Sequence, residues 1–260
     1  MAHAVAGQPF RQQLVREVRR LAYEESRAPT LRRAHEILTR DGAKAVSGRA
    51  PILCMFGGGY GSGKSALKRR LTEQGELPAS QAVRIEPDEI LRSLPGYLEL
   101  VKRGQVEEAG ALHHQSNELT RRVLRRALEL GCDIVYDTAL GNPDRARREL
   151  QAARAAGYRI FLIGVTADIP IARARAAKRS ARYGLPEIPI DSLLASHRSF
   201  SENFASFASL ANRVSLYESN EEPLLIASGE TRAPGESLVL QIHDEERYRQ
   251  FLDKAENSVA

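Results

Sequence analysis

Residues 51–68 read PILCMFGGGYGSGKSALK, and this stretch decides the fold. An apolar run at 52–56 is followed by a glycine-rich segment, and a helix is expected to begin at Lys64. Gly58, four intervening residues and Gly63-Lys64-Ser65 match the phosphate-loop pattern. Glycines without Cβ let successive N–H groups turn inward around an anion, and the next helix directs its positive dipole end to the same point.

This pattern predicts a site for a nucleoside triphosphate and Mg²⁺. Lys64 would reach the β- and γ-phosphates, and the Ser65 hydroxyl would take one position on the metal. A plain glycine-rich turn is the alternative, but a strand before the loop and Lys-Ser with a helix after it favour phosphate binding. The residues expected to bind nucleotide are Gly58, Gly59, Tyr60, Gly61, Ser62, Gly63, Lys64 and Ser65.

The composition is that of one α/β domain with appendages. The chain has 260 residues, of which 42% are hydrophobic, which is enough to bury a sizeable core. Its 38 basic residues are balanced by 33 acidic ones, so the mixed charge favours anionic small molecules at least as much as nucleic acid. Cys54 and Cys132 both lie in apolar runs, so we expect buried thiols and neither a disulfide framework nor a cysteine zinc site.

No apolar run approaches the length needed to cross a bilayer, and the N-terminus lacks a long apolar core. A cytoplasmic location is therefore expected. Residues 10–46 carry apolar positions at helical spacing on either side of Pro29, which predicts two helices. Their arginines could bind a polyanion, but they alternate with glutamates, which favours a solvated helix face.

Two acids follow predicted strands. Residues 82–85 form a short β-prone run that ends in Glu86-Pro87-Asp88, and residues 132–136 form a strand that ends in Asp137-Thr138. In a parallel α/β sheet both ends face the same rim as the phosphate loop. Asp88 could accept the proton of an attacking hydroxyl, or it could cap the next helix, and both interpretations remain open at this point.

Asp137 could organise Mg²⁺ or bind substrate, and Thr138 could hydrogen-bond a substrate hydroxyl. A cap role is less favoured for Asp137, because Asp144 lies closer to the start of the helix predicted at 144–156.

A run of cations lies on the helix predicted before Tyr183. It consists of Arg173, Arg175, Lys178, Arg179 and Arg182, with no acid within it. Arg175 and Arg179 are four residues apart and share one helix face, where they could close over a transferring phosphoryl group. RNA binding is the rival explanation, but no basic platform interleaved with aromatic residues accompanies the run.

The remaining predicted elements are a long helix over about 106–130, another over about 190–210, a hairpin of strands 214–217 and 224–227, and a terminal helix at 244–254. His113 and His114 lie on the long helix, where adjacent positions point about 100° apart. No HExxH pattern surrounds them, which favours structural or substrate-contacting roles over a metal site.

Over about residues 51–227 the chain resembles the zeta-toxin family of phosphate-loop kinases. The resemblance rests on GGYGSGKS, on RIEPDE (84–89), on residues 113–120 with Ser116, and on Tyr136-Asp137-Thr138. Studied members phosphorylate UDP-N-acetylglucosamine on a sugar hydroxyl. The resemblance implies that Asp88 is the catalytic base, that residues 113–120 line the sugar-nucleotide site, and that Arg175 and Arg179 lie at the family's lid arginine.

The sequence departs from the family pattern at two places. Asp137 directly precedes Thr138, where familiar members have a longer acid and a glycine, and the region around Ala195 and Ser196 lacks an arginine that many relatives carry. Either Arg182 or Arg198 supplies the missing cation, or the lid is weaker than in those relatives. By residue type the expected catalytic residues are Lys64, Asp88, Arg175 and Arg179; the expected substrate-binding residues are Glu86, Asp88, His113, Ser116, Asp137, Thr138 and Arg182; the expected Mg²⁺ ligands are Ser65 and Asp137.

We therefore predict a three-layer α/β phosphate-loop kinase with a mostly parallel sheet. Its expected parts are an N-terminal helical extension (1–48), the kinase domain (50–228) and a C-terminal tail with a helix (229–260). The expected reaction transfers the γ-phosphate of ATP, with Mg²⁺, to a hydroxyl of a UDP-N-acetyl sugar. Alternatives are another acceptor (a nucleoside, a dinucleotide or an antibiotic) or a nucleic-acid-stimulated NTPase. A small antitoxin is a possible partner that the resemblance implies; neither a membrane nor nucleic acid is expected.

Overall fold

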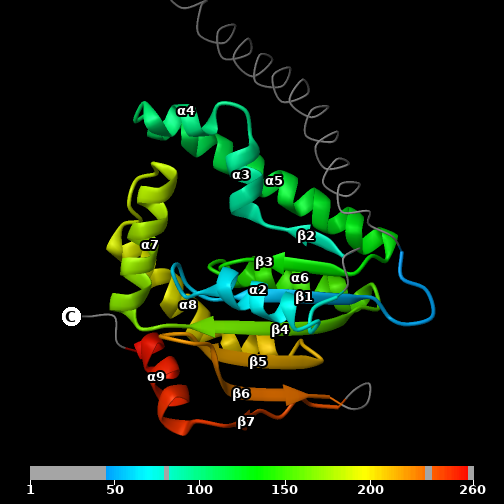
Figure 1. The fold of residues 1–260 in the computed structure, drawn as a ribbon. Helices are drawn as coiled ribbons and strands as arrows, with labels where there is room; N and C mark the ends of the chain where they lie inside the picture. Colours follow the sequence, from blue (N-terminus) through cyan, green and yellow to red (C-terminus); the bar gives the residue numbers. More distant parts are fainter. Residues whose placement is uncertain (1–44, 79–81, 232–235, 257–260) are drawn as a thin grey trace, which may run out of the picture.

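The computed structural model describes residues 45–78, 82–231 and 236–256 (Figure 1). The two helices predicted within residues 10–46 lie almost entirely outside these ranges. Within them the chain forms one sheet with helices on both faces (Figure 1). This arrangement confirms the predicted three-layer α/β fold.

The sheet has seven strands in the order β2-β3-β1-β4-β5-β6-β7. The strands from β2 to β5 in this order run parallel, and β6 and β7 run antiparallel to their neighbours. The β5–β6 pair is the predicted hairpin. The bounds are β1 Ile52–Gly57, β2 Val83–Ile85, β3 Ile134–Asp137, β4 Arg159–Thr166, β5 Arg213–Glu218, β6 Leu224–Glu230 and β7 Gln241–Ile242.

The helices occupy both faces of the sheet. Helix α2 packs on one face through Leu67 and Leu71, and α5, α6, α8 and α9 pack on the other (Figure 1). The central strand β1 is buried from Leu53 to Gly57, which explains its unbroken apolar run. The bounds are α2 Lys64–Glu73, α3 Pro87–Ser93, α4 Tyr97–Lys102, α5 Val106–Leu130, α6 Pro143–Ala155, α7 Ile169–Tyr183, α8 Ile190–Ala208 and α9 Glu245–Glu256.

Two helix starts differ from the sequence prediction. Helix α3 begins at Pro87 with Glu86 at the N-cap position, so Asp88 lies inside the first turn and is not the cap. Helix α6 is capped by Asn142, whose side chain accepts a hydrogen bond from the Arg145 N–H, and not by Asp144. In both helices proline is the first helical residue, where its missing N–H costs nothing, and the N-cap lies two residues before the acid that the sequence offered as the cap.

Helix α9 is part of the main core. Its Phe251 is 1% exposed and packs against Phe200 and Phe204 of α8, with ring centroids 5.7 and 5.2 Å apart. Lys254, one turn on, donates hydrogen bonds to Thr166 Oγ1 and the Ala167 carbonyl at the end of β4. The C-terminal segment therefore supports the end of the sheet that carries the phosphate loop.

No described helix is long and apolar enough to span a membrane.

Candidate functional site

The candidate residues lie at the carboxyl end of the parallel strands, where α3, the phosphate loop and α7 follow β2, β1 and β4 (Figure 1). Across the sheet the order is Glu86 after β2, Asp137 at the end of β3, and the phosphate loop after β1. Beyond the loop come Asp168 after β4 and Ser219 after β5. Glu86 and Asp137 therefore lie on one side of the loop, and α7 with its arginines lies on the other.

The phosphate loop adopts the conformation that its glycines allow. Gly63, the N-cap of α2, has φ 96°, in the left-handed region. A Cβ there would lie 2.4 Å from Ser219 Oγ, and a Cβ at Gly61 would lie 2.0 Å from the Ala172 carbonyl oxygen. The loop is thus held tightly between α7 and the segment after β5, which only glycine permits.

Lys64 turns back over the loop. Its Nζ donates hydrogen bonds to the carbonyls of Gly58 (2.7 Å) and Gly59 (3.2 Å). Burial lowers the pKa of Lys64. Phosphate oxygens would replace these carbonyls as partners and would favour the charged form of the ammonium.

Helix α8 holds the loop from behind. The Tyr60 N–H donates to Ser196 Oγ at 3.0 Å, and His197 Nε2 lies 2.9 Å from the Tyr60 carbonyl oxygen. His197 is 4% exposed, and burial lowers its pKa to about 4. The ring is therefore neutral near pH 7 and donates to that carbonyl through Nε2–H.

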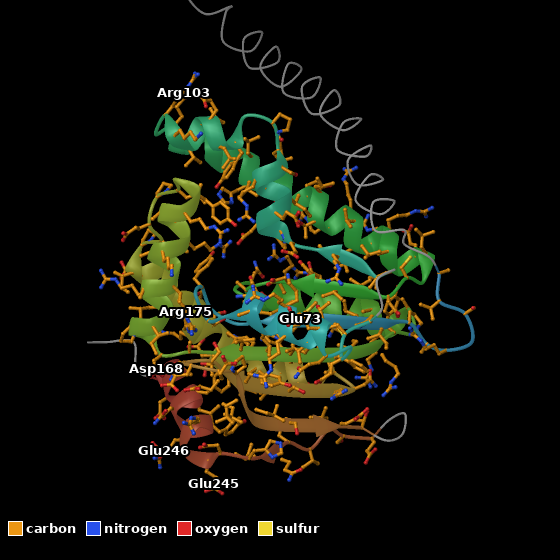
Figure 2. The ribbon with its side chains drawn as sticks, viewed as in Figure 1. Glu73, Arg103, Asp168, Arg175, Glu245 and Glu246 are labelled. Atoms are coloured by element: carbon orange, nitrogen blue, oxygen red, sulfur yellow. The ribbon has the colours of Figure 1, made fainter. Side chains whose placement is uncertain are left out.

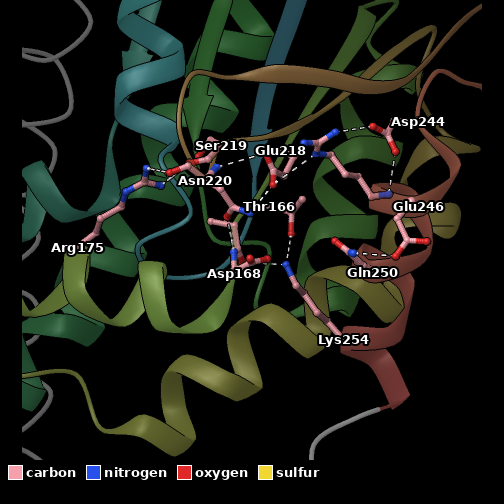
Figure 3. Close-up of polar contacts among 12 residues, drawn as sticks. Thr166, Asp168, Arg175, Glu218, Ser219, Asn220, Asp244, Glu246, Gln250 and Lys254 are labelled. Atoms are coloured by element: carbon pink, nitrogen blue, oxygen red, sulfur yellow. Dashed lines mark hydrogen bonds and ion pairs between the residues drawn. The ribbon is translucent and has the colours of Figure 1, made fainter.

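Arg175 extends from α7 toward the loop that follows β5 (Figure 3). Its guanidinium donates to the carbonyls of Ser219 (2.6 Å) and Asn220 (3.1 Å), and Ser219 Oγ donates to the Ser62 carbonyl at 2.6 Å. Asn220 Oδ1 in turn accepts from the Asp168 N–H at the start of α7. Arg175 thus joins α7, the β5–β6 loop and the phosphate loop, an engagement that the sequence did not predict.

Arg179, one turn further along α7, forms an ion pair with Asp88 of α3. The sequence suggested that the α7 cations have no acidic partner because none lies within the run; the partner comes from 91 residues away. Both side chains are about half exposed, so the pair is weak and can exchange partners at little cost.

Lys68 is a residue of the site that the sequence analysis missed. It lies one turn after Lys64 on α2, and its Nζ is 2.7 Å from Glu86 Oε1 and 3.1 Å from Asp137 Oδ2. Burial alone would lower the pKa of Lys68, but the charges of Asp137 and Glu86 raise it above the usual value. Lys68 therefore holds the acids that follow two neighbouring strands beside the phosphate loop.

The other predicted substrate-binding residues differ in burial and in their hydrogen-bond partners. Thr138 is buried at the end of β3; its Oγ1 accepts from the Leu140 N–H at 3.2 Å, and its hydroxyl also interacts with the Tyr136 side chain. Ser116 is buried and donates to the Pro87 carbonyl, which fixes the start of α3 next to Asp88. His113 is exposed and lies edge-on to Tyr97, with centroids 5.7 Å apart. Arg182 lies at the far end of α7, 5.8 Å from the centre of the Tyr183 ring.

The donors present suit Mg²⁺ bound largely by nucleotide phosphates and water. The described residues contain no group of three or more His, Cys, Asp or Glu side chains that could hold a metal by themselves. Ser65 is exposed at the start of α2, and Asp137 supplies one carboxylate at the end of the strand next to the loop. Magnesium in phosphoryl-transfer sites commonly has only one or two protein ligands, so this set fits.

Two comparisons of the sequence with known proteins find similar proteins. A family model described as Zeta toxin matches residues 36–231. A calmodulin calcium-dependent NAD kinase of Arabidopsis thaliana is 24% identical over 229 residues; the match covers 69% of this chain and only 43% of that relative's length.

Two solved structures share the fold. The structure from the PezAT chromosomal toxin–antitoxin system of Streptococcus pneumoniae has a TM-score of 0.58 at 17% identity and covers 77% of this chain and 79% of that one. The structure of AvrRxo1-ORF1:-ORF2 with ATP has a TM-score of 0.57 at 18% identity and covers 87% of this chain and 69% of that one. At these identities the similarity concerns the fold alone.

Proposed function

The chain belongs to the zeta toxin family, and we propose that it is a kinase that transfers the γ-phosphate of ATP to a hydroxyl of a UDP-N-acetyl sugar. Membership of this family supports a nucleotide-dependent phosphotransferase. The nature of the acceptor rests on the resemblance of Asp88, Asp137 and Thr138 to the family's motifs.

One observation carries the proposal: the Asp88–Arg179 ion pair brings a carboxylate from α3 and a guanidinium from α7 together at the rim that carries the phosphate loop. A phosphoryl transfer needs a carboxylate at the attacking hydroxyl and cations at the phosphate. The Asp88–Arg179 pair and Lys64 supply both.

In the proposed reaction the acceptor hydroxyl lies against Asp88. As its oxygen forms a bond to the γ-phosphorus, the bond from that phosphorus to the β,γ-bridging oxygen breaks, ADP leaves, and the hydroxyl proton passes to the Asp88 carboxylate. Arg179 exchanges Asp88 for the phosphoryl oxygens once nucleotide is bound. Bidentate guanidinium–phosphate contacts stabilise the charge that spreads over those oxygens.

The remaining residues position the reactants. The backbone N–H groups of residues 58–65 hold the phosphates, and Lys64 turns from the Gly58 and Gly59 carbonyls to the β- and γ-phosphates. Arg175 stabilises charge directly only if it releases Ser219; in its present contacts it holds the loop in shape. Glu86, His113 and Thr138 are proposed to contact the acceptor.

Mg²⁺, when bound, would neutralise phosphate charge, with Ser65 and Asp137 as its protein ligands. Lys68 orients Asp137 for this role through the 3.1 Å contact.

NAD is a second candidate acceptor. The similarity to the Arabidopsis NAD kinase favours it, since the aligned region covers 69% of this chain. A dinucleotide offers ribose hydroxyls to Asp88 in place of sugar hydroxyls, so the catalytic arrangement would be unchanged.

A protein partner is also proposed. The related structures come from a toxin–antitoxin system and from a two-component AvrRxo1 complex. By analogy, a small antitoxin would bind this chain and block its site.

The test is incubation of the pure protein with Mg·ATP and a panel of UDP-sugars, NAD, nucleosides and antibiotics, with products read by mass. A gain of one phosphate on UDP-N-acetylglucosamine supports the first proposal, and a gain on NAD supports the second. ATP hydrolysis without any phosphorylated acceptor, stimulated by RNA, would contradict both and favour an NTPase.

A further inference from the structure

Helix α9 lies outside the residues that the family model matches, yet its last turn reaches the end of the sheet that carries the phosphate loop. Glu246 marks its first turn, away from the loop, and Asp168 at the start of α7 lies beside its other end (Figure 2). Lys254, in the last turn, donates hydrogen bonds to Thr166 Oγ1 (2.8 Å) and to the Ala167 carbonyl (2.7 Å) (Figure 3). These contacts join α9 to the segment between β4 and α7.

The end of β4 packs against the phosphate loop. The Thr166 carbonyl accepts a hydrogen bond from the Ser219 N–H (2.9 Å), and Ser219 Oγ donates to the carbonyl of Ser62 in the loop (2.6 Å). A Cβ at Gly58 would lie 2.2 Å from the Val165 carbonyl oxygen, so the loop and the strand are in close contact. Because packed groups transmit strain, a shift of this strand end also shifts the loop.

Lys254 also places positive charge behind the phosphate loop. Burial lowers the pKa of Lys254, and the carboxylates of Asp168 and Glu218 lie close enough to oppose this effect. The charges of Lys254 and Lys64 both lower the pKa of His197, the ring that supports the loop from α8. Removing Lys254 would leave the two carboxylates with less positive charge beside them, near the place where nucleotide phosphates are expected to bind.

The packing of α9 alone does not account for a lysine at this position. Phe251, one turn earlier, is 1% exposed and fastens the helix to the core without any polar group. An ammonium that is withdrawn from water and bound to two neutral oxygens regains only part of its lost hydration. A residue type that stability does not favour is expected where a site needs it, and here it supplies two hydrogen bonds at the end of β4.

We propose that Lys254 is a positioning residue of the nucleotide site. Through Thr166 and Ala167 it holds the end of β4, and with it the phosphate loop, in the conformation that binds Mg·ATP. This inference rests on the proposed function and extends its site to a helix that the family model does not cover. It gives α9 a role in nucleotide affinity and none in the chemical step.

Calorimetric titration with Mg²⁺ and a non-hydrolysable ATP analogue tests the inference without requiring turnover, and urea unfolding of the same proteins measures their stability. The full chain carries Lys254→Met, Thr166→Val or both changes. Two further variants of α9 are the controls. Arg249→Met removes an exposed cation that pairs with Glu246. Phe251→Leu weakens the packing of the helix and leaves Lys254 in place.

We expect Lys254→Met to weaken binding of the analogue about tenfold, through the loss of hydrogen bonds from a charged donor. Thr166→Val should have a smaller effect, because the Ala167 carbonyl still accepts from Lys254. The double variant should bind no more weakly than Lys254→Met, since both changes remove the same contact. Arg249→Met should bind like the wild type. Phe251→Leu should unfold at a lower urea concentration and still bind the analogue with wild-type affinity.

Binding by Lys254→Met at the wild-type affinity would overturn the inference. Equal weakening in Phe251→Leu would also overturn it, because any loosening of α9 would then have the same effect. If Lys254→Met does not fold, Thr166→Val decides: wild-type affinity in that variant removes the proposed role. A wild type that does not bind the analogue would contradict both this inference and the proposed function. Failure of the proposed function alone would appear as Lys254-dependent binding of the analogue with no phosphate transferred from Mg·ATP to any acceptor.

Discussion

Replacing Lys68 by methionine removes the cation that holds two carboxylates together at the end of the sheet. The Lys68 and Asp137 side chains are 12% and 15% exposed, and Glu86 is 34% exposed. Removing one partner costs about 3–5 kcal/mol in a fully buried pair and up to about 1 kcal/mol in an exposed one, so we expect this intermediate site to lose about 2 kcal/mol of unfolding free energy. The remaining carboxylates would then face each other unpaired.

Urea unfolding measures this loss as a shift of the midpoint at unchanged slope. Lys102→Met, a change of the same type at an exposed position of α4, is the matched control and should stay within about 0.5 kcal/mol of the wild type. The double variant Lys68→Met/Asp137→Asn removes both charges of the more deeply buried pair. Its unfolding free energy should be about 1 kcal/mol higher than the sum of the two single changes predicts, and this difference is the coupling energy between Lys68 and Asp137. An Lys68→Met variant as stable as Lys102→Met, with no coupling to Asp137, would refute the assignment.

Three other predictions follow from the same geometry. Asp88→Asn should abolish phosphate transfer while the dissociation constant of ATP stays within a fewfold of the wild type, as measured by product mass and calorimetry; normal turnover would remove Asp88 as the base. Gly63→Ala should weaken ATP binding at least tenfold, because residue 63 has φ 96° and its new Cβ would lie 2.4 Å from Ser219 Oγ. Gly75→Ala is the control: it also places alanine at a positive φ, but nothing lies within 4 Å of the new Cβ. Burial lowers the pKa of His197 in the folded chain to about 4, so between pH 6.5 and pH 4 the unfolded chain binds a proton at this ring and the folded chain does not. The free energy of unfolding should therefore fall by up to ~3 kcal/mol as the pH is lowered from 6.5 to 4. The His197→Gln variant should show a shallower fall when urea unfolding is measured across this pH range.

The phosphate loop could be read from the sequence because every part of it is local. Strand, glycines, Lys64 and helix follow one another within eighteen residues, and the physical reason for each is a backbone conformation or a dipole at that position. The rim positions of Asp88 and Asp137 followed from the rule that parallel strands end on one side. The positions of these two acids could therefore be predicted without knowledge of any side-chain contact.

The contacts that complete the site are distant in sequence and could not be derived in this way. Lys68 appears as an ordinary lysine of an amphipathic helix, and its partner Asp137 lies 69 residues away. Arg175 and Arg179 share a face in sequence, yet one contacts the carbonyls of the β5–β6 loop and the other contacts Asp88. Spacing within one helix predicts a shared face, but the partner depends on which element packs opposite it. The spacing of Lys64 and Lys68, one turn apart on α2, was the only local signal for Lys68.

The central claim is that the phosphate loop and Asp88 act on the same phosphoryl group. The most direct measurement follows ADP and phosphorylated acceptor together in a single turnover of Mg·ATP with UDP-N-acetylglucosamine or NAD, for the wild type and for Asp88→Asn. We predict one phosphorylated acceptor for each ADP in the wild type, and neither product from Asp88→Asn although it still binds ATP. ADP formed with inorganic phosphate and no phosphorylated acceptor, at equal rates in both proteins, would contradict the account.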